Sequence, residues 1–164
     1  MLEKILLRNK KNASWLKFCN PRYVYTSTDL SEVKRILQEI QTKVEKDGLY
    51  AAGYLSYEAA PAFDPAFIVH DKPILPLLCF GVYEEVEELS TIADDRPSYN
   101  DDLKWTLDTS KDCYEKKFLY IKQQIELGNT YQINYTLRNL ADGITDPYSF
   151  FLAKATHAPF AAFI

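Results

Sequence analysis

Apolar residues recur with a helical period over residues 27–48, "STDLSEVKRILQEIQTKVEKDG". One stripe of the predicted helix carries Val33, Ile36, Leu37, Ile40 and Val44. This spacing is typical of an amphipathic helix that covers a core. Asp29 can cap the start of the helix, with Glu32 three residues later, and Gly48 stands where a left-handed terminal residue is favoured.

The same period returns over residues 109–130, "TSKDCYEKKFLYIKQQIELGNT". The apolar stripe of this predicted helix consists of Tyr114, Phe118, Ile121 and Ile125. Thr109 and Asp112 have capping-box spacing, and Gly128 marks the end of the helix. A shorter helix is predicted over residues 147–155, with Asp146 as its cap and Pro147 as its first residue.

Strand patterns occupy most of the remaining chain. We expect strands at residues 3–8, in the first part of 49–69, within 75–89, at 131–136 and at 159–164. The second of these is nearly continuous in apolar residues, which predicts a central strand covered on both faces, and Gly53 inside it indicates close backbone approach. The third continues into an acidic patch that is predicted to be a solvated edge, at Glu84, Glu85, Glu87 and Glu88.

The polar, turn-rich stretch at residues 93–102, "ADDRPSYNDD", predicts a boundary between two parts of the chain. Together with the many strand-favouring aromatic residues, the predicted elements on either side of it indicate a folded sheet protein with helices. The last six residues, "PFAAFI", are apolar and strand-forming, so we expect the chain to be cut within a longer protein.

Composition narrows the class of protein. Hydrophobic residues make up 47% of the 164 residues and aromatic residues 14%, which excludes a disordered chain. The net charge of −4 argues against a nucleic-acid or anionic-membrane partner, because neither would meet a cationic patch. No stretch approaches the roughly 20 apolar residues of a membrane span, so a soluble cytoplasmic protein is expected.

Single chemical groups give weaker indications. The three cysteines, Cys19, Cys79 and Cys113, are far apart and in no CxxC pair, so we expect ordinary buried thiols rather than a disulfide framework or a zinc site. His70 and His157 lack a second ligand at metal spacing, and no metal site is predicted.

The stretch "YQINYT", residues 131–136, places two amides, Gln132 and Asn134, two residues apart. On a strand they would share one face, while Tyr131, Ile133 and Tyr135 would point toward a core. Either this amide face is solvated or pairs with neighbouring strands, or it contacts a ligand. The spacing alone leaves the alternatives open.

Three segments together resemble a known family. The stretch "IELGNTYQINYTLR" is similar to the start of the chorismate-utilising enzyme domain. The stretches "AAGYLSYEAAPAFDP" and "WLKFCNP" resemble the N-terminal domain of the aminodeoxychorismate (para-aminobenzoate) synthase component I subgroup. The resemblance implies an α+β fold with a mainly antiparallel sheet and packed helices, the N-terminal part of an anthranilate synthase component I-like fold. It also implies that residues 1–100 are the N-terminal domain and 101–164 the truncated start of the catalytic domain.

In that family, the catalytic Lys and His and the magnesium-binding glutamates follow the segment that matches "PFAAFI". The resemblance therefore implies Mg²⁺ in the full enzyme with ligands outside this chain, and an inactive 164-residue piece. Glu58 and Asp64 lie in the segment that matches the N-terminal domain, so a structural role is expected for each rather than an acid–base pair.

The resemblance also gives Gln132 a role. Related isochorismate and salicylate synthases have at this position a Lys that acts as general base toward water. A Gln amide has no accessible pKa, so it can orient a nucleophile without deprotonating it. Ammonia attacks through its own lone pair, so Gln132 is consistent with amination of chorismate, and Asn134 is expected to contact the substrate or to fix the Gln132 rotamer.

A regulatory tryptophan pocket in related anthranilate synthases uses a Leu-Leu-Glu-Ser and a Pro-Tyr-Met segment. The matching stretches here are residues 6–9, "LLRN", and 159–161, "PFA", which makes Pro159 and Phe160 the candidate pocket residues. The serine is missing and Phe replaces Tyr, which weakens the case for tryptophan.

The leading hypothesis is the N-terminal part of an aminodeoxychorismate synthase, which makes 4-amino-4-deoxychorismate from chorismate and ammonia for folate. A glutamine amidotransferase subunit would supply the ammonia, and an aminodeoxychorismate lyase domain is fused in some members. The alternatives are an anthranilate synthase component I fragment and a stand-alone, non-catalytic module that binds an aromatic ligand or a partner. Nothing in the sequence decides the amination position.

Overall fold

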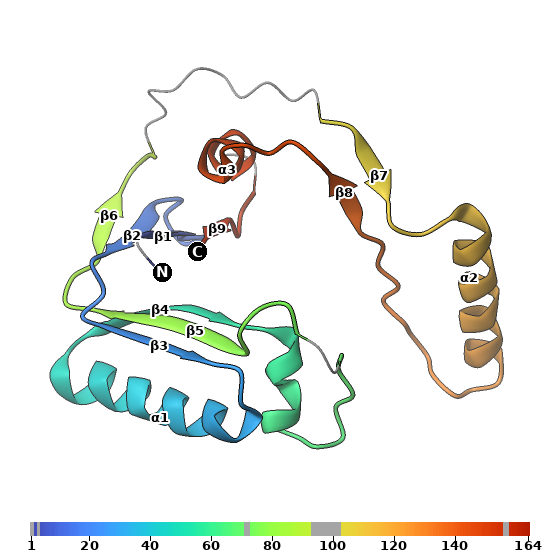
Figure 1. The fold of residues 1–164 in the computed structure, drawn as a ribbon, viewed down its shortest axis with the longest axis horizontal. Helices are drawn as coiled ribbons and strands as arrows, with labels where there is room; N and C mark the ends of the chain where they lie inside the picture. Colours follow the sequence, from blue (N-terminus) through green and yellow to red (C-terminus); the bar gives the residue numbers. More distant parts are fainter. Residues whose placement is uncertain (1, 3, 71–72, 93–102, 156–157) are drawn as a thin grey trace. The chain divides into compact units, whose positions relative to one another are not determined.

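A computed structural model of the chain describes residues 2, 4–70, 73–92, 103–155 and 158–164 (Figure 1). The chain divides into two compact units, Met1–Arg96 with Phe151–Ile164, and Pro97–Phe150. The strands are β1 Lys4–Arg8, β2 Trp15–Cys19, β3 Tyr23–Ser27, β4 Tyr50–Leu55, β5 Leu78–Tyr83, β6 Glu87–Leu89, β7 Trp105–Leu107, β8 Asn139–Ala141 and β9 Ala162–Phe163. The helices are α1 Leu30–Asp47, the 3₁₀-helix η1 Tyr57–Ala62, α2 Lys111–Glu126 and α3 Pro147–Ala155.

The described strands pair only in antiparallel fashion, which confirms the predicted α+β fold with a mainly antiparallel sheet. They form one sheet of order β6-β2-β1-β9, a second of order β3-β5-β4, and the pair β7-β8. The first two sheets belong to the first unit, and the pair belongs to the second unit.

The first unit is layered. Helix α1 covers one face of the β3-β5-β4 sheet, and the other face turns toward β1 and β2 (Figure 1). The core between α1 and its sheet consists of Val33, Ile36, Ile40, Leu49, Ala59, Leu77, Leu78 and Val82. The core between the two sheets consists of Leu2, Ile5, Phe18, Ala52 and Tyr83. Both faces of the β3-β5-β4 sheet are therefore covered.

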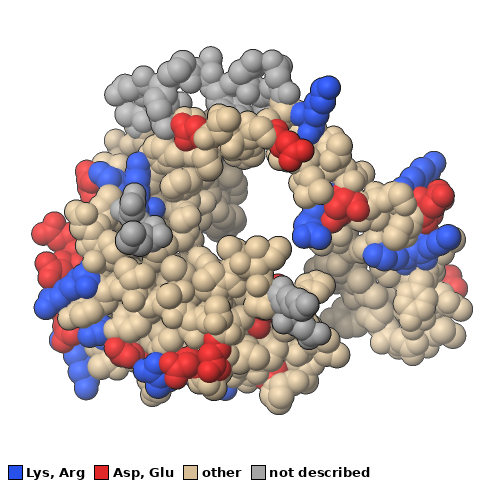
Figure 2. Space-filling view, in the orientation of Figure 1, with Lys and Arg blue, Asp and Glu red and all other residues tan. Residues whose placement is uncertain are grey.

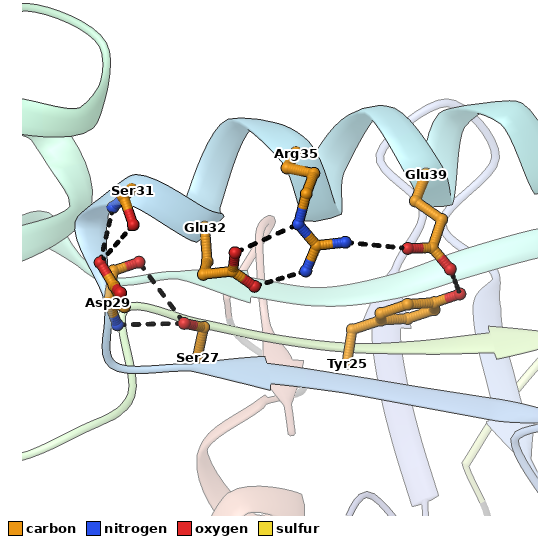
Figure 3. Close-up of polar contacts among 7 residues, drawn as sticks. All are labelled: Tyr25, Ser27, Asp29, Ser31, Glu32, Arg35 and Glu39. Atoms are coloured by element: carbon orange, nitrogen blue, oxygen red, sulfur yellow. Dashed lines mark hydrogen bonds and ion pairs between the residues drawn. The ribbon is translucent and has the colours of Figure 1, made fainter.

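The start of α1 forms as its capping residues predict (Figure 3). Asp29 Oδ1 accepts hydrogen bonds from the backbone N–H and the hydroxyl of Ser31, both at 2.8 Å. Glu32 does not complete a capping box, because its carboxylate pairs with Arg35 and the Asp29 N–H donates to Ser27 Oγ instead. Asp29 is confirmed as the cap, and the reciprocal half of the predicted box is wrong.

The polar face of α1 continues this network. Arg35 also reaches Glu39, whose Oε1 accepts the Tyr25 hydroxyl at 2.7 Å. Burial and this hydrogen bond raise the pKa of Tyr25 to about 12. Figure 2 shows Lys and Arg interspersed with Asp and Glu over this part of the surface. The helix ends at Gly48, with φ 67°, as predicted.

Strand β4 lies at an edge of its sheet, so the prediction of a central strand at residues 50–55 is wrong. The central strand is β5, which pairs with both β3 and β4. A run of apolar residues reports that the faces of a strand are covered, and it does not report the order of strands within the sheet. The prediction for Gly53 is confirmed, because a Cβ there would lie 2.6 Å from Phe80 Cα.

The segment 75–89 forms two strands in different sheets rather than one. The chain turns between β5 and β6, and β6 becomes the edge of the four-stranded sheet. Glu87 pairs with Lys17 at 2.8 Å, and Glu88 accepts the Ser14 hydroxyl at 2.5 Å. These contacts fix an exposed edge, which confirms the predicted environment of the acidic patch at β6.

Helix α3 places aromatic side chains against the four-stranded sheet. Phe151 lies edge-on to Trp15, with ring centroids 5.8 Å apart, and 5.3 Å from Phe163 of β9. Asp146 caps this helix as predicted, because its Oδ1 accepts the Tyr148 N–H at 3.0 Å.

Candidate functional site

The candidate residues of the second unit follow helix α2. Its cap is Ser110, whose Oγ accepts the Cys113 N–H at 3.3 Å, while the Thr109 hydroxyl donates to Asp108. The predicted cap at Thr109 is therefore wrong by one residue. The exit from α2 is as predicted, since Gly128 has φ 74°. The Cys113 side chain is exposed, which corrects its prediction as a buried thiol.

Residues 131–138 form no strand, so the predicted strand at 131–136 is wrong. A strand requires a neighbour that completes its backbone hydrogen bonds. Within the described residues of the second unit, only β7 and β8 pair with each other, and neither pairs with residues 131–136. Residues 131–136 therefore have strand-favouring side chains but no neighbouring strand among the described residues to pair with.

Asp108, which precedes α2, contacts Arg138, which ends the 131–138 segment. Arg138 Nε lies 2.9 Å from Asp108 Oδ2, and the Asp108 N–H donates to the Arg138 carbonyl at 3.0 Å. The Thr109 hydroxyl and then Arg138 lower the pKa of the Asp108 carboxyl. Together with the β7-β8 pair, these contacts close a loop that carries α2 and residues 128–138.

Gln132 and Asn134 both lie on the surface of this loop. Within the described chain, neither side chain makes a hydrogen bond, and the Gln132 carbonyl accepts the Thr130 hydroxyl at 3.1 Å. Tyr131 is 93% exposed and Ile133 is 43% exposed, so the prediction that both point toward a core is wrong. Two unpaired amides on an exposed segment are available to a ligand.

Tyr135 is the residue of this segment that packs. Its ring stacks on Tyr114 of α2, with centroids 5.6 Å apart and planes 9° apart. The Tyr135 hydroxyl is buried and has no hydrogen-bond partner among the described residues. An unpaired buried hydroxyl is costly, so it is a candidate ligand contact that the alternation pattern, which sent Tyr135 into a core, did not reveal.

A second region brings together the two segments that the resemblance linked to regulation. The Arg8 N–H donates to the Ala161 carbonyl at 2.8 Å, so residues 6–9 and 159–161 are neighbours. Pro159 and Phe160 are exposed, and the Lys10 ammonium lies 4.9 Å from the Phe160 ring centroid. The geometry joins these segments, and a ligand for them stays a prediction.

Comparison with known proteins gives one match. The chain matches the chorismate binding enzyme family over residues 2–164. It belongs to that family. No curated protein and no solved structure matches the chain.

For a chorismate binding enzyme, the next question is the metal. Among the described residues, no three His, Cys, Asp or Glu side chains gather in a way that would hold a metal ion. His70 is exposed, and His157 lies outside the described residues. The described chain therefore offers no donor set that fits Mg²⁺.

Glu58 and Asp64 of this chorismate binding enzyme lie far along the sequence from the amides of Gln132 and Asn134. Asp64 Oδ1 accepts the Ala66 N–H at 2.9 Å, which fits the structural role predicted for it. Glu58 lies on η1 and is half-buried.

None of the described helices is long and apolar enough to cross a bilayer.

Proposed function

We propose that this chain is the N-terminal part of an aminodeoxychorismate synthase component I, which aminates chorismate with ammonia to 4-amino-4-deoxychorismate. The observation that carries the proposal is the family match over residues 2–164, combined with an amide at Gln132. The match supports a chorismate-utilising enzyme, and the amide supports amination over hydration.

The chemistry of Gln132 follows from its donors and acceptor. Its carbonyl oxygen can accept a hydrogen bond from ammonia, and its NH₂ can donate to a substrate oxygen, but neither group removes a proton at neutral pH. Water would need a base to become a nucleophile, whereas ammonia has a free lone pair. Because Gln132 cannot act as a base, a site that contains it favours ammonia over water as the nucleophile.

Asn134 and Tyr135 lie on the same segment as Gln132, and each offers a further contact with the substrate. Asn134 is exposed and its side chain has no hydrogen-bond partner in the described part of the chain, so its amide can contact a polar group of the substrate. The unpaired Tyr135 hydroxyl can donate to a carboxylate, and chorismate carries two. By resemblance, the Lys, the His and the Mg²⁺ ligands of the reaction follow Ile164 in the full enzyme, which works in the cytoplasm with a glutamine amidotransferase subunit and, in some members, a fused lyase domain.

The test is product analysis on the intact protein that carries this sequence, incubated with chorismate, Mg²⁺ and ammonium. The expected product retains the pyruvyl group and carries one amine in place of the ring hydroxyl. Anthranilate would establish the tryptophan-pathway alternative. Isochorismate, the isomer that forms when water attacks in place of ammonia, or no product in the presence of ammonium, would overturn the proposal.

The role of Gln132 is tested with Gln132→Leu, which removes the amide and keeps much of the volume. Loss of a hydrogen bond to a reacting group predicts a fall of roughly tenfold to a hundredfold in kcat/KM for ammonia. Gln123→Leu, on the exposed surface of α2, is the matched control and is expected to leave kcat/KM unchanged.

A partner-binding module is the second candidate, and one observation favours it. Helix α2 has no buried residue among those described, and its apolar stripe includes Phe118 at 45% and Ile125 at 41% exposure. In that case the intact protein would bind chorismate or a partner without turnover under any of the conditions above.

A further inference from the structure

The chain that follows α2, residues 129–138, is attached to the second unit near both ends of the helix. At its start, the Asn129 N–H donates to the Gln124 carbonyl at 3.0 Å, and Asn129 Nδ2 donates to Gln124 Oε1 at 2.8 Å. At its end, Arg138 contacts Asp108, which precedes α2. Between these attachments the chain runs from the end of α2 back to β8 (Figure 1).

The two attachments leave the segment little slack. The 16 residues of α2 rise roughly 24 Å along the helix axis. The chain from Asn129 to Arg138 reaches at most about 30 Å when it is fully extended. Residues 129–138 are therefore drawn out between the two ends of α2, although they pair with no strand among the described residues.

A third contact strengthens the attachment at the start of α2. The Tyr135 ring stacks on Tyr114, which lies in the first turn of the helix. Tyr135 and Arg138 are thus both held at this end, by Tyr114 and Asp108. Gln132 lies between this double attachment and the one at the far end of α2, so its position depends on both.

Asp108 uses all of its polar groups in these contacts. Its Oδ2 accepts Arg138 Nε at 2.9 Å, its Oδ1 accepts the Thr109 hydroxyl at 2.8 Å, and its N–H donates to the Arg138 carbonyl at 3.0 Å. The Asp108 side chain is 21% exposed, whereas the Arg138 side chain is 78% exposed. An ion pair this open contributes little to global stability, so its expected effect is on the local path of the chain.

We propose that Asp108 is a positioning residue for amination: its pair with Arg138 keeps residues 129–138 drawn out, so that Gln132 presents its amide to the reactants from a fixed place. This inference rests on the proposed function, because Asp108 acts only through Gln132. The Gln132 side chain has no hydrogen-bond partner in the described part of the chain, so its place is set by how the segment is attached. A displacement of about 1 Å at a reacting group can cost about a hundredfold in rate.

Hydrogen exchange of the intact protein without substrate tests the attachment itself. Asp108→Asn keeps the shape of the side chain and removes its charge, and it is expected to speed exchange about threefold in peptides that cover residues 128–138. The matched control is Asp142→Asn, an exposed carboxylate of the same unit that has no partner among the described residues, and it should leave exchange unchanged. Unchanged exchange in Asp108→Asn would overturn the proposal, whether or not the protein aminates chorismate.

Kinetics then tests whether Asp108 acts through Gln132. Asp108→Asn should lower kcat/KM for ammonia about threefold to tenfold in the native protein, and by less than about twofold in a Gln132→Leu background, because residues that act as a unit do not add. An equal loss in both backgrounds would mean a merely structural role and would overturn the proposal. A protein that forms no aminated product fails the proposed function, and the exchange comparison still decides whether Asp108 holds the segment.

Variants of Arg138 separate the ion pair from a direct contact with the substrate. Arg138→Lys keeps a cation beside Asp108, and it should keep most of the kcat/KM that Arg138→Gln loses. The double variant Asp108→Asn, Arg138→Gln should lose no more than the worse of its two single variants. If the two losses add, Arg138 acts on the substrate without Asp108 and the proposal fails.

Discussion

Helices α1 and α2 have the same sequence design and different surroundings. Each begins at a side-chain cap, ends at a left-handed glycine and carries one apolar stripe. Helix α1 buries Val33, Ile36 and Ile40 against a sheet, whereas α2 buries none of its residues within the described chain. The comparison teaches that a periodic pattern determines the helix and its apolar face, but not what covers that face.

The difference also separates stability from chemistry. The first unit has two hydrophobic cores, and the second unit holds the candidate amides on a loop closed by short strands and one ion pair. Regions with few buried apolar contacts open at low free energy. The segment with Gln132 is therefore predicted to open at lower free energy than the cores of the first unit.

The largest effect is expected from matched truncations on the two helices. Ile40→Ala removes a side chain that is 5% exposed, and it should lower the free energy of unfolding by about 2–4 kcal/mol. Ile125→Ala removes one that is 41% exposed, and it should change it by less than about 0.5 kcal/mol. Urea unfolding measures both, with Trp15 fluorescence in a Trp105→Phe background for the first unit and helical circular dichroism for α2. Equal losses would mean that the stripe of α2 is covered as α1 is.

Gly53→Ala tests the close approach of β4 and β5. A methyl group there meets the backbone of Cys79 and Phe80, so the first unit should lose about 1–3 kcal/mol. Gly128→Ala is the counterpart in the second unit, where nothing lies within 4 Å and only the positive φ is strained. It should leave the Trp15 unfolding midpoint in place. A midpoint shift for Gly128→Ala alone would reverse the comparison.

The caps sharpen the comparison further. Asp29→Ala removes the cap of α1 and should lower the unfolding midpoint of the first unit, because α1 is part of its core. Ser110→Ala removes the corresponding cap of α2 and should reduce helical circular dichroism without moving that midpoint. A global loss from Ser110→Ala would show that the two units unfold as one.

The smallest effect concerns Tyr83, which is fully buried and whose hydroxyl has no hydrogen-bond partner among the residues that the structure describes. Burial raises its pKa from 10.0 to about 12, so the unfolded chain releases this proton first as pH rises. Stability should be at its full value below pH 10 and fall between pH 10 and 12. Tyr83→Phe should reduce that slope and raise stability at pH 7 by up to about 1 kcal/mol.

The control for Tyr83 is Tyr25→Phe. The pKa of Tyr25 is also raised to about 12, so this variant should reduce the alkaline slope as well, but it removes the hydrogen bond to Glu39 and should not stabilise the protein at pH 7. A lower stability of Tyr83→Phe at pH 7 would contradict the unpaired state of its hydroxyl.

Local signals in the sequence predicted the local structure well. The Asp29 cap, Gly48, Gly53 and the start of α3 at Asp146 all follow from rules that act within a few residues. The order of β3, β5 and β4 and the break between β5 and β6 depend on pairing between distant segments, which no local pattern reports. Strands β2, β3, β7 and β8 were also not predicted as strands. Strand β3 pairs with β5 and β7 with β8, far along the chain, whereas β2 pairs with its sequence neighbour β1 as well as with the distant β6.

The candidate site was predictable in its residue types and not in its geometry. Gln132 and Asn134 stood out because amides are rare in apolar strand patterns, but the alternation that placed them on one face requires a paired strand. The Tyr135–Tyr114 stack and the Asp108–Arg138 pair join residues 21 and 30 apart along the chain, and no spacing rule connects them.

The most direct test of the account asks where chorismate acts. Hydrogen exchange of the intact protein is followed by mass spectrometry, with and without chorismate and Mg²⁺. The account predicts slower exchange in peptides that cover residues 128–138 and unchanged exchange in β3, β4 and β5 of the first unit. Unchanged exchange at 128–138 under saturating chorismate would contradict the assignment of Gln132 and Asn134 to the site.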